Sequence, residues 1–428
     1  MKKIILLISF IILFLSCKES SKVAETTWVN SSHLDHLYQE VIIDKKQMAI
    51  IHIYCEYPDY KWVDDADEGI SCIDDVARAG IFYLRDYKSK QNEVSLNKAK
   101  NLIRFVLHLQ SENGYFYNFI FPDYSINKNG KTSINTPNWW SWRAGWILTE
   151  SLTSLPASDS VLADSVHQSL DKLFAAVKKD IPKKYDTKVI EGFVRPNWLL
   201  LNTASDQTAI LLLSLKPYAD MKNDADLKTY ADKLAEGIQM MQVKSPTTFL
   251  DGAFLSWENS WHAWGNTQSY ALLNSGFSKE NHDAALYEIN HFYQTLSAGK
   301  YWNELTLEKK NDSLTTNYKN RFDQIAYGIR PMVLSSMKAF ELTGDSSYAE
   351  KAAYFATWLT GNNITKKVMY ESSTGRGFDG IRNDSTINMN SGAESTIEAL
   401  LSIQAIENNP LSKKYFERLN SASDSKLK

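Results

Sequence analysis

The chain has 428 residues, with 47 Lys and Arg against 50 Asp and Glu, which gives a formal net charge of −3. This near-balance argues against nucleic-acid binding, which needs a clustered excess of basic residues. The hydrophobic fraction of 43% is that of a globular protein and not of a disordered chain. The 12 Trp, 22 Tyr and 18 Phe make the chain rich in aromatic residues, and the Trp content needs an explanation beyond core packing.

The first residues have the features of a bacterial lipoprotein signal. Two lysines precede an apolar run over 4–15, which is shorter than the roughly 20 residues of a membrane helix, and a small residue stands directly before Cys17. An uncleaved anchor or an ordinary secretory signal is the alternative. We therefore expect a protein of the bacterial cell envelope that meets the membrane only through its lipid. The predicted divisions are a signal peptide over 1–16, the lipidated Cys17 and a tether over 17–29, and one folded domain over 30–428.

Twelve segments have apolar residues at helical spacing, while strand alternation is scarce. They span 30–44, 72–89, 93–112, 138–155, 159–178, 203–217, 223–242, 262–275, 279–298, 321–343, 346–361 and 391–407. Every second one is more apolar, at a repeat of about 60–70 residues, which predicts stacked helical hairpins. Six hairpins can close into an all-α (α/α)6 toroid, with 30–44 completing the outer ring. An open solenoid, or a bundle of unrelated helical domains, is the alternative.

The connections between these hairpins are unequal in length. The links within a hairpin are short, whereas each link to the next inner helix is long, and long loops in a compact domain usually carry function. We expect one face of the toroid to have tight turns and the other to have elaborate loops. Some of these loops are expected to hold short strands, as at 115–120. The long links are 113–137, 179–202, 243–261, 299–320 and 362–390.

Each long loop ends in polar and aromatic residues at the start of an inner helix, so ring closure would bring them into one funnel. Trp and Tyr offer flat faces to sugar rings, and Asp, Asn, Arg and Glu bind hydroxyl groups. The expected sugar-stacking residues are Trp139, Trp140, Trp142, Trp261 and Trp264. The expected residues for binding hydroxyl or acidic groups are Arg78, Arg143, Asn266, Asp323, Tyr327, Arg330 and Asp379.

Hydrolysis of a glycosidic bond needs two carboxyl groups. Asp74 and Asp75 open the first inner helix, with Arg78 one turn further on, and Glu394 opens the last. We predict Asp75 as the base, with Asp74 as second choice, and Glu394 as the general acid; their proximity depends on ring closure. Helix capping is the alternative role, because first-turn acids stabilise helices and Ser391-x-x-Glu394 is a capping-box pattern.

His262 suggests a different chemistry. A polysaccharide lyase acting on a uronic acid needs a group that neutralises the carboxylate and a base, and His262 or Tyr327 could supply the base. A non-catalytic glycan-binding lipoprotein is a third hypothesis. An oligo- or polysaccharide is the expected partner in each case, and the sequence leaves the oligomeric state open.

No cofactor is expected. The acidic residues Asp64, Asp65 and Asp67 could hold a structural Ca²⁺, but they lack EF-hand spacing, which favours a solvated loop. The GxGxxG pattern over 375–380 has no βαβ unit around it and does not indicate dinucleotide binding. Cys55 and Cys72 have neither CxxC spacing nor a His neighbour, which disfavours zinc and leaves a disulfide open.

Five short motifs together resemble the six-hairpin glycosidase superfamily over roughly residues 30–410, and in particular a little-characterised branch sometimes found beside or fused to glycosyltransferases. The resemblance implies an (α/α)6 toroid and carbohydrate processing, but it assigns no catalytic residue. The patterns of the unsaturated-uronyl hydrolases that share the fold are missing. A lipid anchor on this fold is similar to Bacteroidetes-type surface glycan-degradation systems. The motifs are Asp74-Asp75-x-x-Arg78, Trp140-x-x-Arg143, Tyr327-Gly328-x-Arg330, Phe378-Asp379-Gly380-Ile381 and Asn390-Ser391-Gly392-Ala393-Glu394-Ser395.

Overall fold

The computed structural model describes residues 27–274, 276–310 and 313–424. The predicted signal peptide and Cys17 lie outside these residues, as does most of the tether. Within the described ranges, no helix combines the length and the apolar character that crossing a membrane requires.

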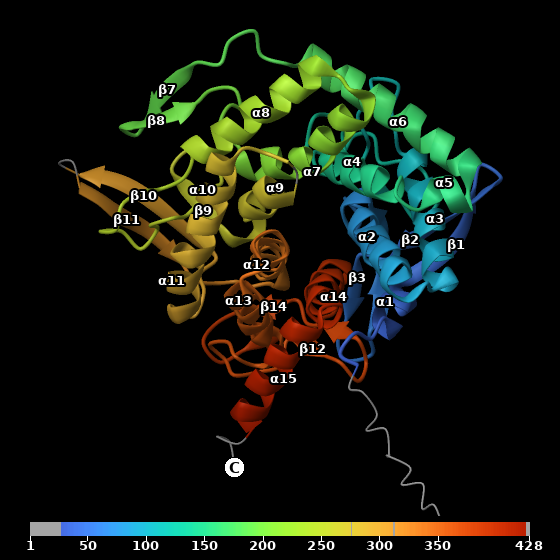
Figure 1. The fold of residues 1–428 in the computed structure, drawn as a ribbon. Coiled ribbons are helices and arrows are strands. Elements are labelled where there is room, and N and C mark those ends of the chain that lie inside the picture. Colours follow the sequence, from blue (N-terminus) through green and yellow to red (C-terminus); the bar gives the residue numbers. More distant parts are fainter. Residues whose placement is uncertain (1–26, 275, 311–312, 425–428) are drawn as a thin grey trace, which may run out of the picture.

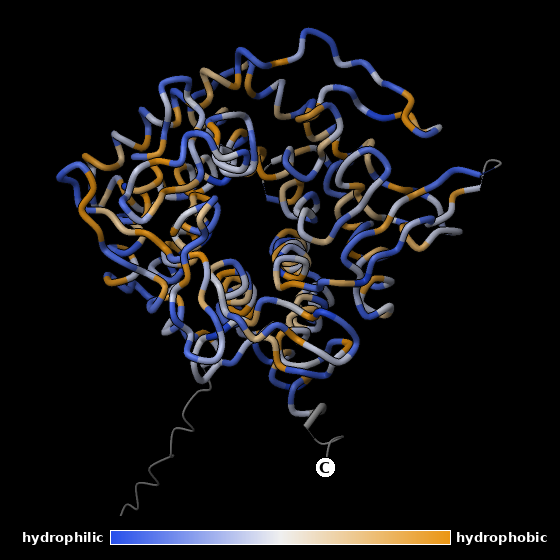
Figure 2. The backbone as a smooth tube through the Cα atoms, turned by 180° about the vertical axis from the view of Figure 1, so that it is seen from behind, coloured by the Kyte–Doolittle hydropathy of each residue, from blue (hydrophilic) through white to orange (hydrophobic). Residues whose placement is uncertain are grey.

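Six inner helices form a closed ring (Figure 1). They are α2 (Ile73–Lys90), α4 (Trp139–Ser151), α7 (Ser205–Lys222), α9 (Gln268–Asn274), α12 (Arg330–Thr343) and α14 (Ala393–Glu407). Each contacts the next, and the last, α14, contacts the first, α2. Seen from behind, the chain likewise encircles one centre (Figure 2). The predicted (α/α)6 toroid is therefore confirmed, and the open solenoid is excluded.

Each inner helix packs against the outer helix that follows it. The outer helices are α3 (Glu93–His108), α6 (Ser160–Lys179), α8 (Ala225–Met240), α10 (Lys279–Asn290), α13 (Ser346–Ala356) and α15 (Pro410–Asp424). An outer helix such as α6 buries one stripe at three- and four-residue spacing, which includes Leu162, Val166 and Leu170. An inner helix such as α7 is buried nearly all round, because it lies between the outer ring and its neighbours in the inner ring.

The helix predicted over 30–44 is wrong. The chain forms the short helix α1 (Ser32–Leu37) and then an antiparallel hairpin of β1 (Tyr38–Ile43) and β2 (Lys46–Ile51). The turn residues Asp44 and Lys45 have φ angles of 49° and 63°, the left-handed geometry of a tight hairpin turn. β-Branched residues around this turn favour a strand over a helix.

The sixth outer position belongs instead to α15, which the apolar spacing did not predict. Two signals mark its start. Pro410 occupies the first helical position, where its missing N–H costs nothing. Asn409 caps the helix, because its Oδ1 accepts from the backbone N–H groups of Leu411 and Ser412 at 3.0 and 3.1 Å.

Two inner helices begin later than predicted. The residues before α9 and α12 form the 3₁₀ turns η1 (Ala263–Gly265) and η2 (Ala326–Gly328), and a third turn, η3 (Thr357–Thr360), follows α13. The segment predicted over 279–298 divides into α10 and α11 (Phe292–Ala298), and the short α5 (Leu155–Ser158) precedes α6.

The long connections hold the short strands, as expected. Of the segment 115–120, only its last two residues form a strand. The pairs are β3 (Tyr54–Glu56) with β4 (Lys61–Val63), β5 (Ser71–Cys72) with β6 (Phe119–Ile120), β7 (Thr187–Ile190) with β8 (Phe193–Pro196), β9 (Ser260–His262) with β10 (Glu304–Lys310), β10 with β11 (Ser313–Asn320), β12 (Tyr370–Glu371) with β13 (Arg376–Gly377), and β14 (Gly380–Ile381) with β15 (Ile387–Asn388).

Candidate active site

Ring closure brings the acidic residues of the first and last inner helices onto one guanidinium. Arg78 on α2 donates from Nη2 to Asp75 Oδ1 at 2.7 Å and to Glu394 Oε2, on α14, at 3.1 Å. The distance between Asp75 Oδ1 and Glu394 Oε2 is therefore at most the sum of these two hydrogen-bond lengths. Residues that lie more than three hundred positions apart in the sequence become neighbours only because α14 packs against α2.

A second buried acid, Glu398, was not predicted. It lies one turn after Glu394 and joins two guanidinium groups: Arg78 Nη1 donates to its Oε1 at 2.7 Å, and Arg330 Nε donates to its Oε2. Glu398 and Arg330 are almost fully buried. A glutamate within the otherwise apolar segment of α14 was the signal available in the sequence, because a charge is seldom buried without a partner.

Arg143 on α4 forms a second ion pair beside the first. Its Nη1 lies 2.5 Å from Asp74 Oδ1, and its Nη2 donates to the hydroxyl of Tyr327 at 2.7 Å. Asn118, from the loop before α4, donates to the other oxygen of Asp74 at 3.2 Å. The guanidinium carbons of Arg78, Arg143 and Arg330 lie 5.2, 5.4 and 5.2 Å from the centroid of the Tyr327 ring, so this ring packs among three cations.

A pocket of about 190 Å³ opens above this network. Its polar lining consists of Glu394, Asp379, Ser395 and the hydroxyl-bearing rings of Tyr54 and Tyr327. Asp379 comes from the loop between β13 and β14. Its Oδ1 accepts from the backbone N–H of Gly392 at 3.0 Å and from Ser395 Oγ at 2.9 Å. Two carboxyl groups, Glu394 and Asp379, thus line the same pocket.

Both of these carboxyl groups have raised pKa values. Burial raises the pKa of Glu394; Arg78 opposes this, while the charges of Asp75 and Glu398 add to it. The Glu394 side chain is nevertheless 44% exposed, so the group is surrounded by protein yet open to water on its pocket side. Burial also raises the pKa of Asp379, against the hydrogen bonds from Gly392 and Ser395. Burial raises the pKa of Asp75 as well, against the lowering effect of Arg78.

His262 and two tryptophans form a neighbouring group. His262 Nε2 lies 3.0 Å from Asp206 Oδ2 on α7, and its ring stacks on Trp264 with centroids 3.5 Å apart. Gly265 permits this packing, because a Cβ there would come within 2.3 Å of His262 Cε1. Trp264 is 41% exposed, and its ring lies 6.2 Å from that of Trp139. Trp139 in turn lies 5.4 Å from the Arg143 guanidinium, which joins this group to the Arg143 ion pair.

Several predicted contact residues do not face the pocket. The sugar-stacking role is wrong for Trp140, Trp142 and Trp261, which are buried in the core because helix and strand geometry turns part of any aromatic run inward. Asn266 is fully buried too, and neither atom of its amide has a partner among the described residues. Asp323 lies exposed on its loop and does not line the pocket.

The predicted base and the predicted hydroxyl-binding arginines are also placed differently from expectation. Asp75 is only 4% exposed and lies beneath Arg78 instead of lining the pocket. Arg78, Arg143 and Arg330 are buried as well, and their donors hold acidic side chains rather than face solvent. In this structure these four residues orient other groups.

The groups considered for a metal site or a disulfide form neither in the described part of the chain. Asp65 Oδ1 accepts from the backbone N–H groups of Asp67 and Glu68, both at 2.8 Å, and so stabilises the turn of its own loop. No group of three or more His, Cys, Asp or Glu able to hold a metal ion occurs in the described ranges. Cys55 and Cys72 are both free thiols in buried positions.

Comparison with known proteins places the fold. No family model matches the chain, and no curated protein matches it by sequence. Among solved structures, a sugar epimerase from a ruminal bacterium matches with 12% identity and a TM-score of 0.54, over 83% of this chain and 92% of its own. Cellobiose 2-epimerase from Bacillus thermoamylovorans B4167 matches with 10% identity and a TM-score of 0.56, over 84% and 92%. The chain has the six-hairpin fold.

Hydrolases share this fold with epimerases. A metagenome-derived glycoside hydrolase family 9 endoglucanase matches with 9% identity and a TM-score of 0.50, over 87% of this chain and 79% of its own. The toroid is thus a scaffold of carbohydrate-active enzymes that perform different reactions. At identities this low the likeness concerns the fold alone, so the reaction must be argued from the site.

Proposed function

We propose that this protein is a glycoside hydrolase acting on an oligo- or polysaccharide. The observation that carries the proposal is the pair of carboxyl groups, Glu394 and Asp379, that line one pocket with raised pKa values. Hydrolysis of a glycosidic bond requires a carboxylic acid that protonates the leaving oxygen and a carboxylate that acts as base or nucleophile.

Glu394 is the proposed general acid. It shares a network with Asp75 and Glu398, and these three carboxyl groups face only two guanidinium groups, those of Arg78 and Arg330. The third guanidinium nearby, that of Arg143, pairs with a fourth acid, Asp74, so one negative charge is in excess. Of the three, Glu394 is the most exposed and can exchange a proton with the pocket, which supports its protonated form as the proton donor.

Asp379 is the proposed base or nucleophile, in place of Asp75. The hydrogen bonds from Gly392 and Ser395 favour its ionised form, and its carboxylate lines the pocket. Asp75 lacks this access. We assign to Asp75 and Glu398 the positioning of Arg78, and to Asp74 the positioning of Arg143.

Aromatic side chains supply the proposed sugar-binding surfaces. Tyr54 and Tyr327 line the pocket itself. Trp139 lies next to Arg143, and Trp264 lies next to Trp139. Their flat faces suit the C–H faces of sugar rings. The arrangement supports a substrate of more than one sugar unit. We further propose that the lipid on Cys17 holds this domain at the bacterial cell envelope.

The test is an activity screen of the purified protein on neutral and acidic polysaccharides, with product analysis by mass spectrometry. Glu394→Gln and Asp379→Asn should each lower kcat by about 10²–10⁴-fold, the usual contribution of an acid–base group. Asp323→Asn is the matched control on the same face and should keep near-parental turnover. Full turnover in Glu394→Gln would sink the proposal, and a parent that binds glycans without any turnover would favour the non-catalytic hypothesis.

Proton transfer at a sugar carbon is the second candidate function, and the His262–Asp206 pair favours it. The Asp206 carboxylate lies 3.0 Å from His262 Nε2 and holds the imidazole in place, as a base for epimerisation, isomerisation or elimination requires. His262→Gln would then abolish turnover, and the products would be an isomer of the substrate or an unsaturated uronide that absorbs in the near ultraviolet. For a hydrolase, the products instead contain the elements of water and His262→Gln mainly weakens binding.

A further inference from the structure

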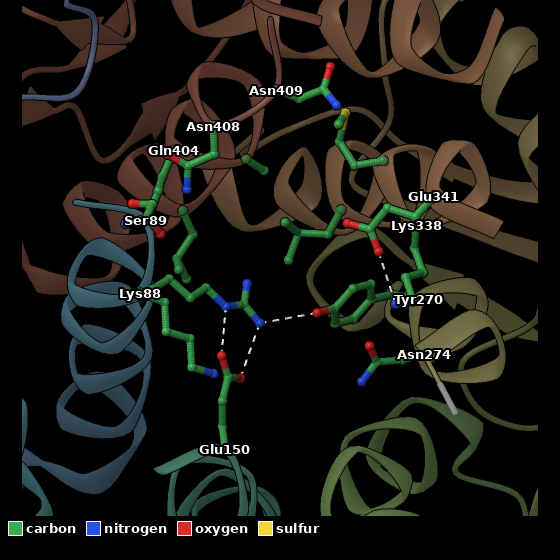
Figure 3. Close-up of a pocket in the computed structure, with 15 residues that line it drawn as sticks. Lys88, Ser89, Glu150, Tyr270, Asn274, Lys338, Glu341, Gln404, Asn408 and Asn409 are labelled. Carbon is green, nitrogen blue, oxygen red and sulfur yellow. Dashed lines mark hydrogen bonds and ion pairs between the residues drawn. The ribbon is translucent and has the colours of Figure 1, made fainter. Parts of the chain in front are cut away.

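A second and larger cavity lies at the opposite end of the ring, with a volume of about 580 Å³ (Figure 3). We call it the rear cavity. Its walls come from the C-terminal parts of every inner helix except α7. It shares no lining residue with the pocket at Glu394. Its residues are Arg85, Lys88, Ser89, Glu150, Tyr270, Asn274, Leu334, Met337, Lys338, Glu341, Leu401, Gln404, Ala405, Asn408 and Asn409.

One buried aromatic side chain packs near an arginine of the rear cavity and also near an arginine of the network around Glu394. Trp146 on α4 is 3% exposed, and the guanidinium carbons of Arg85 and Arg330 each lie 5.8 Å from its ring centroid. Arg330 belongs to the network around Glu398, whereas Arg85 lines the rear cavity. The rear cavity is therefore a site of its own and not the far end of the pocket at Glu394.

The charged groups of the rear cavity are largely neutralised by one another. Arg85 donates to both oxygens of Glu150, at 2.8 and 3.1 Å, and to the hydroxyl of Tyr270 at 3.1 Å. Lys338 pairs with Glu341 at 2.9 Å (Figure 3). Four of the five charged side chains that line the cavity are thus paired with one another, and Lys88 is the fifth. A strongly charged ligand would have to compete with these pairs, which disfavours one.

Amide side chains provide the remaining polar groups, and they are oriented by the fold. Gln404 donates its amide nitrogen to Phe82 O at 3.0 Å, which leaves its Oε1 as an acceptor for a ligand. Asn409 uses its Oδ1 to cap α15, which leaves its Nδ2 as a donor. Asn274 adds an amide from the other side of the cavity, and Asn408 adds one beside Gln404 (Figure 3).

The floor beneath these amides is apolar, formed by Leu334, Met337 and Leu401. Donors and acceptors around an apolar floor match a sugar ring, whose hydroxyl groups both donate and accept and whose C–H face is apolar. The volume is within the range of about 300–1,000 Å³ that ligand pockets have. We infer that the rear cavity is a second saccharide site, which takes a neutral mono- or disaccharide.

This inference does not depend on the reaction at Glu394, and the experiment keeps the two apart. Isothermal titrations are run with the full chain carrying Glu394→Gln, so that turnover does not consume the ligand. The probes are D-glucose, D-mannose, D-galactose, cellobiose and maltose, with D-glucuronate as the anionic probe. Ala405→Trp fills the cavity, Asn274→Leu removes one amide, and Gln294→Leu, an amide on the outside of α11, is the matched control.

We expect at least one neutral sugar to bind. Its affinity should fall by about tenfold or more with Asn274→Leu, the size of one lost hydrogen bond with an unpaired partner, and further with Ala405→Trp. Gln294→Leu should leave it unchanged. Binding by none of the neutral sugars overturns the inference, as does binding that survives both rear-cavity variants. Binding of D-glucuronate alone, lost with Lys88→Gln, also overturns it in favour of an anion site.

Discussion

The outer and inner helices begin in different ways. All six outer helices are capped by the side chain of the residue directly before them, which accepts from a backbone N–H of the first turn; these residues are Asn92, Asp159, Asp224, Ser278, Asp345 and Asn409. Among the inner helices, α4 has such a cap in Asn138, whereas α2, α7, α12 and α14 have none. Instead, distant loops accept from their first N–H groups, as Asn118 O does from Ile73 and Ile53 O from Ala393.

The two rings also differ in what they bury. The outer helix α6 buries an apolar stripe, whereas the inner helices bury the network of Arg78, Glu398 and Arg330. Charges withdrawn from water stabilise a fold only if every partner is present. The difference indicates that the outer ring is stabilised locally, and that the inner ring depends on long-range partners around the groups we assign to chemistry.

The largest expected effect comes from the centre of the inner ring. Glu398→Ala removes the carboxylate that pairs with both Arg78 and Arg330 and leaves buried charge uncompensated. It should therefore lower the free energy of unfolding by about 3–5 kcal/mol. Urea denaturation followed by circular dichroism measures this. The matched change on the outer ring is Glu236→Ala, which breaks an exposed pair with Lys233 and should cost less than about 1 kcal/mol. Equal losses of unfolding free energy in the two variants would contradict the conclusion that the inner ring depends on long-range partners and the outer ring does not.

An intermediate effect is expected at an outer helix. Asp345 caps α13 through Oδ1, which accepts from the backbone N–H of Ser347 at 2.9 Å. Asp345→Ala should therefore lower the free energy of unfolding by about 1 kcal/mol, with no change in activity. Asp345→Asn keeps the acceptor and is the control, with a smaller loss in the same denaturation assay. A drop in kcat with Asp345→Ala would show that the outer ring is not independent of the site.

The smallest expected effect concerns the pH dependence of stability at Glu394. Its pKa in the folded protein is raised above the ordinary value of 4.5, so this carboxyl contributes stability below that value and loses the contribution as the pH rises through its folded pKa. Glu394→Gln does not ionise and should be slightly more stable than the parent at neutral pH. This difference in stability between Glu394→Gln and the parent should decrease as the pH falls toward 4.5.

Thermal unfolding of both proteins across this pH range measures the gap. Glu112→Gln, at an exposed loop position, is the control and should not show the same closing gap. A Glu394→Gln variant that is less stable than the parent at neutral pH would show that the ion pair with Arg78 outweighs burial.

The helical repeat in the sequence was sufficient to predict the six inner helices, five of their outer partners and the long loops before the inner helices, because apolar spacing at the helical period is a local property of the chain. It failed at 30–44, where the turn at Asp44 and Lys45 lacks the Asn-Gly or Asp-Gly pattern typical of a tight hairpin. It also failed at 410–424, where the chain is more polar and the decisive signals were Asn409 and Pro410.

The sequence by itself determined which residue types meet at the loop face, since Asp74, Asp75 and Glu394 lie in the first turn of an inner helix and Asp379 lies in the long loop before α14. Only the tertiary structure decided which of them reach the pocket. Asp75 and Asp379 were both predicted to belong to the site, yet one lies beneath Arg78 and the other lines the pocket. The burial of Asp75, and the way Asp75 and Glu394 share the guanidinium of Arg78, depend on how α14 packs against α2. No local sequence pattern predicts this contact, because the two helices lie near opposite ends of the chain.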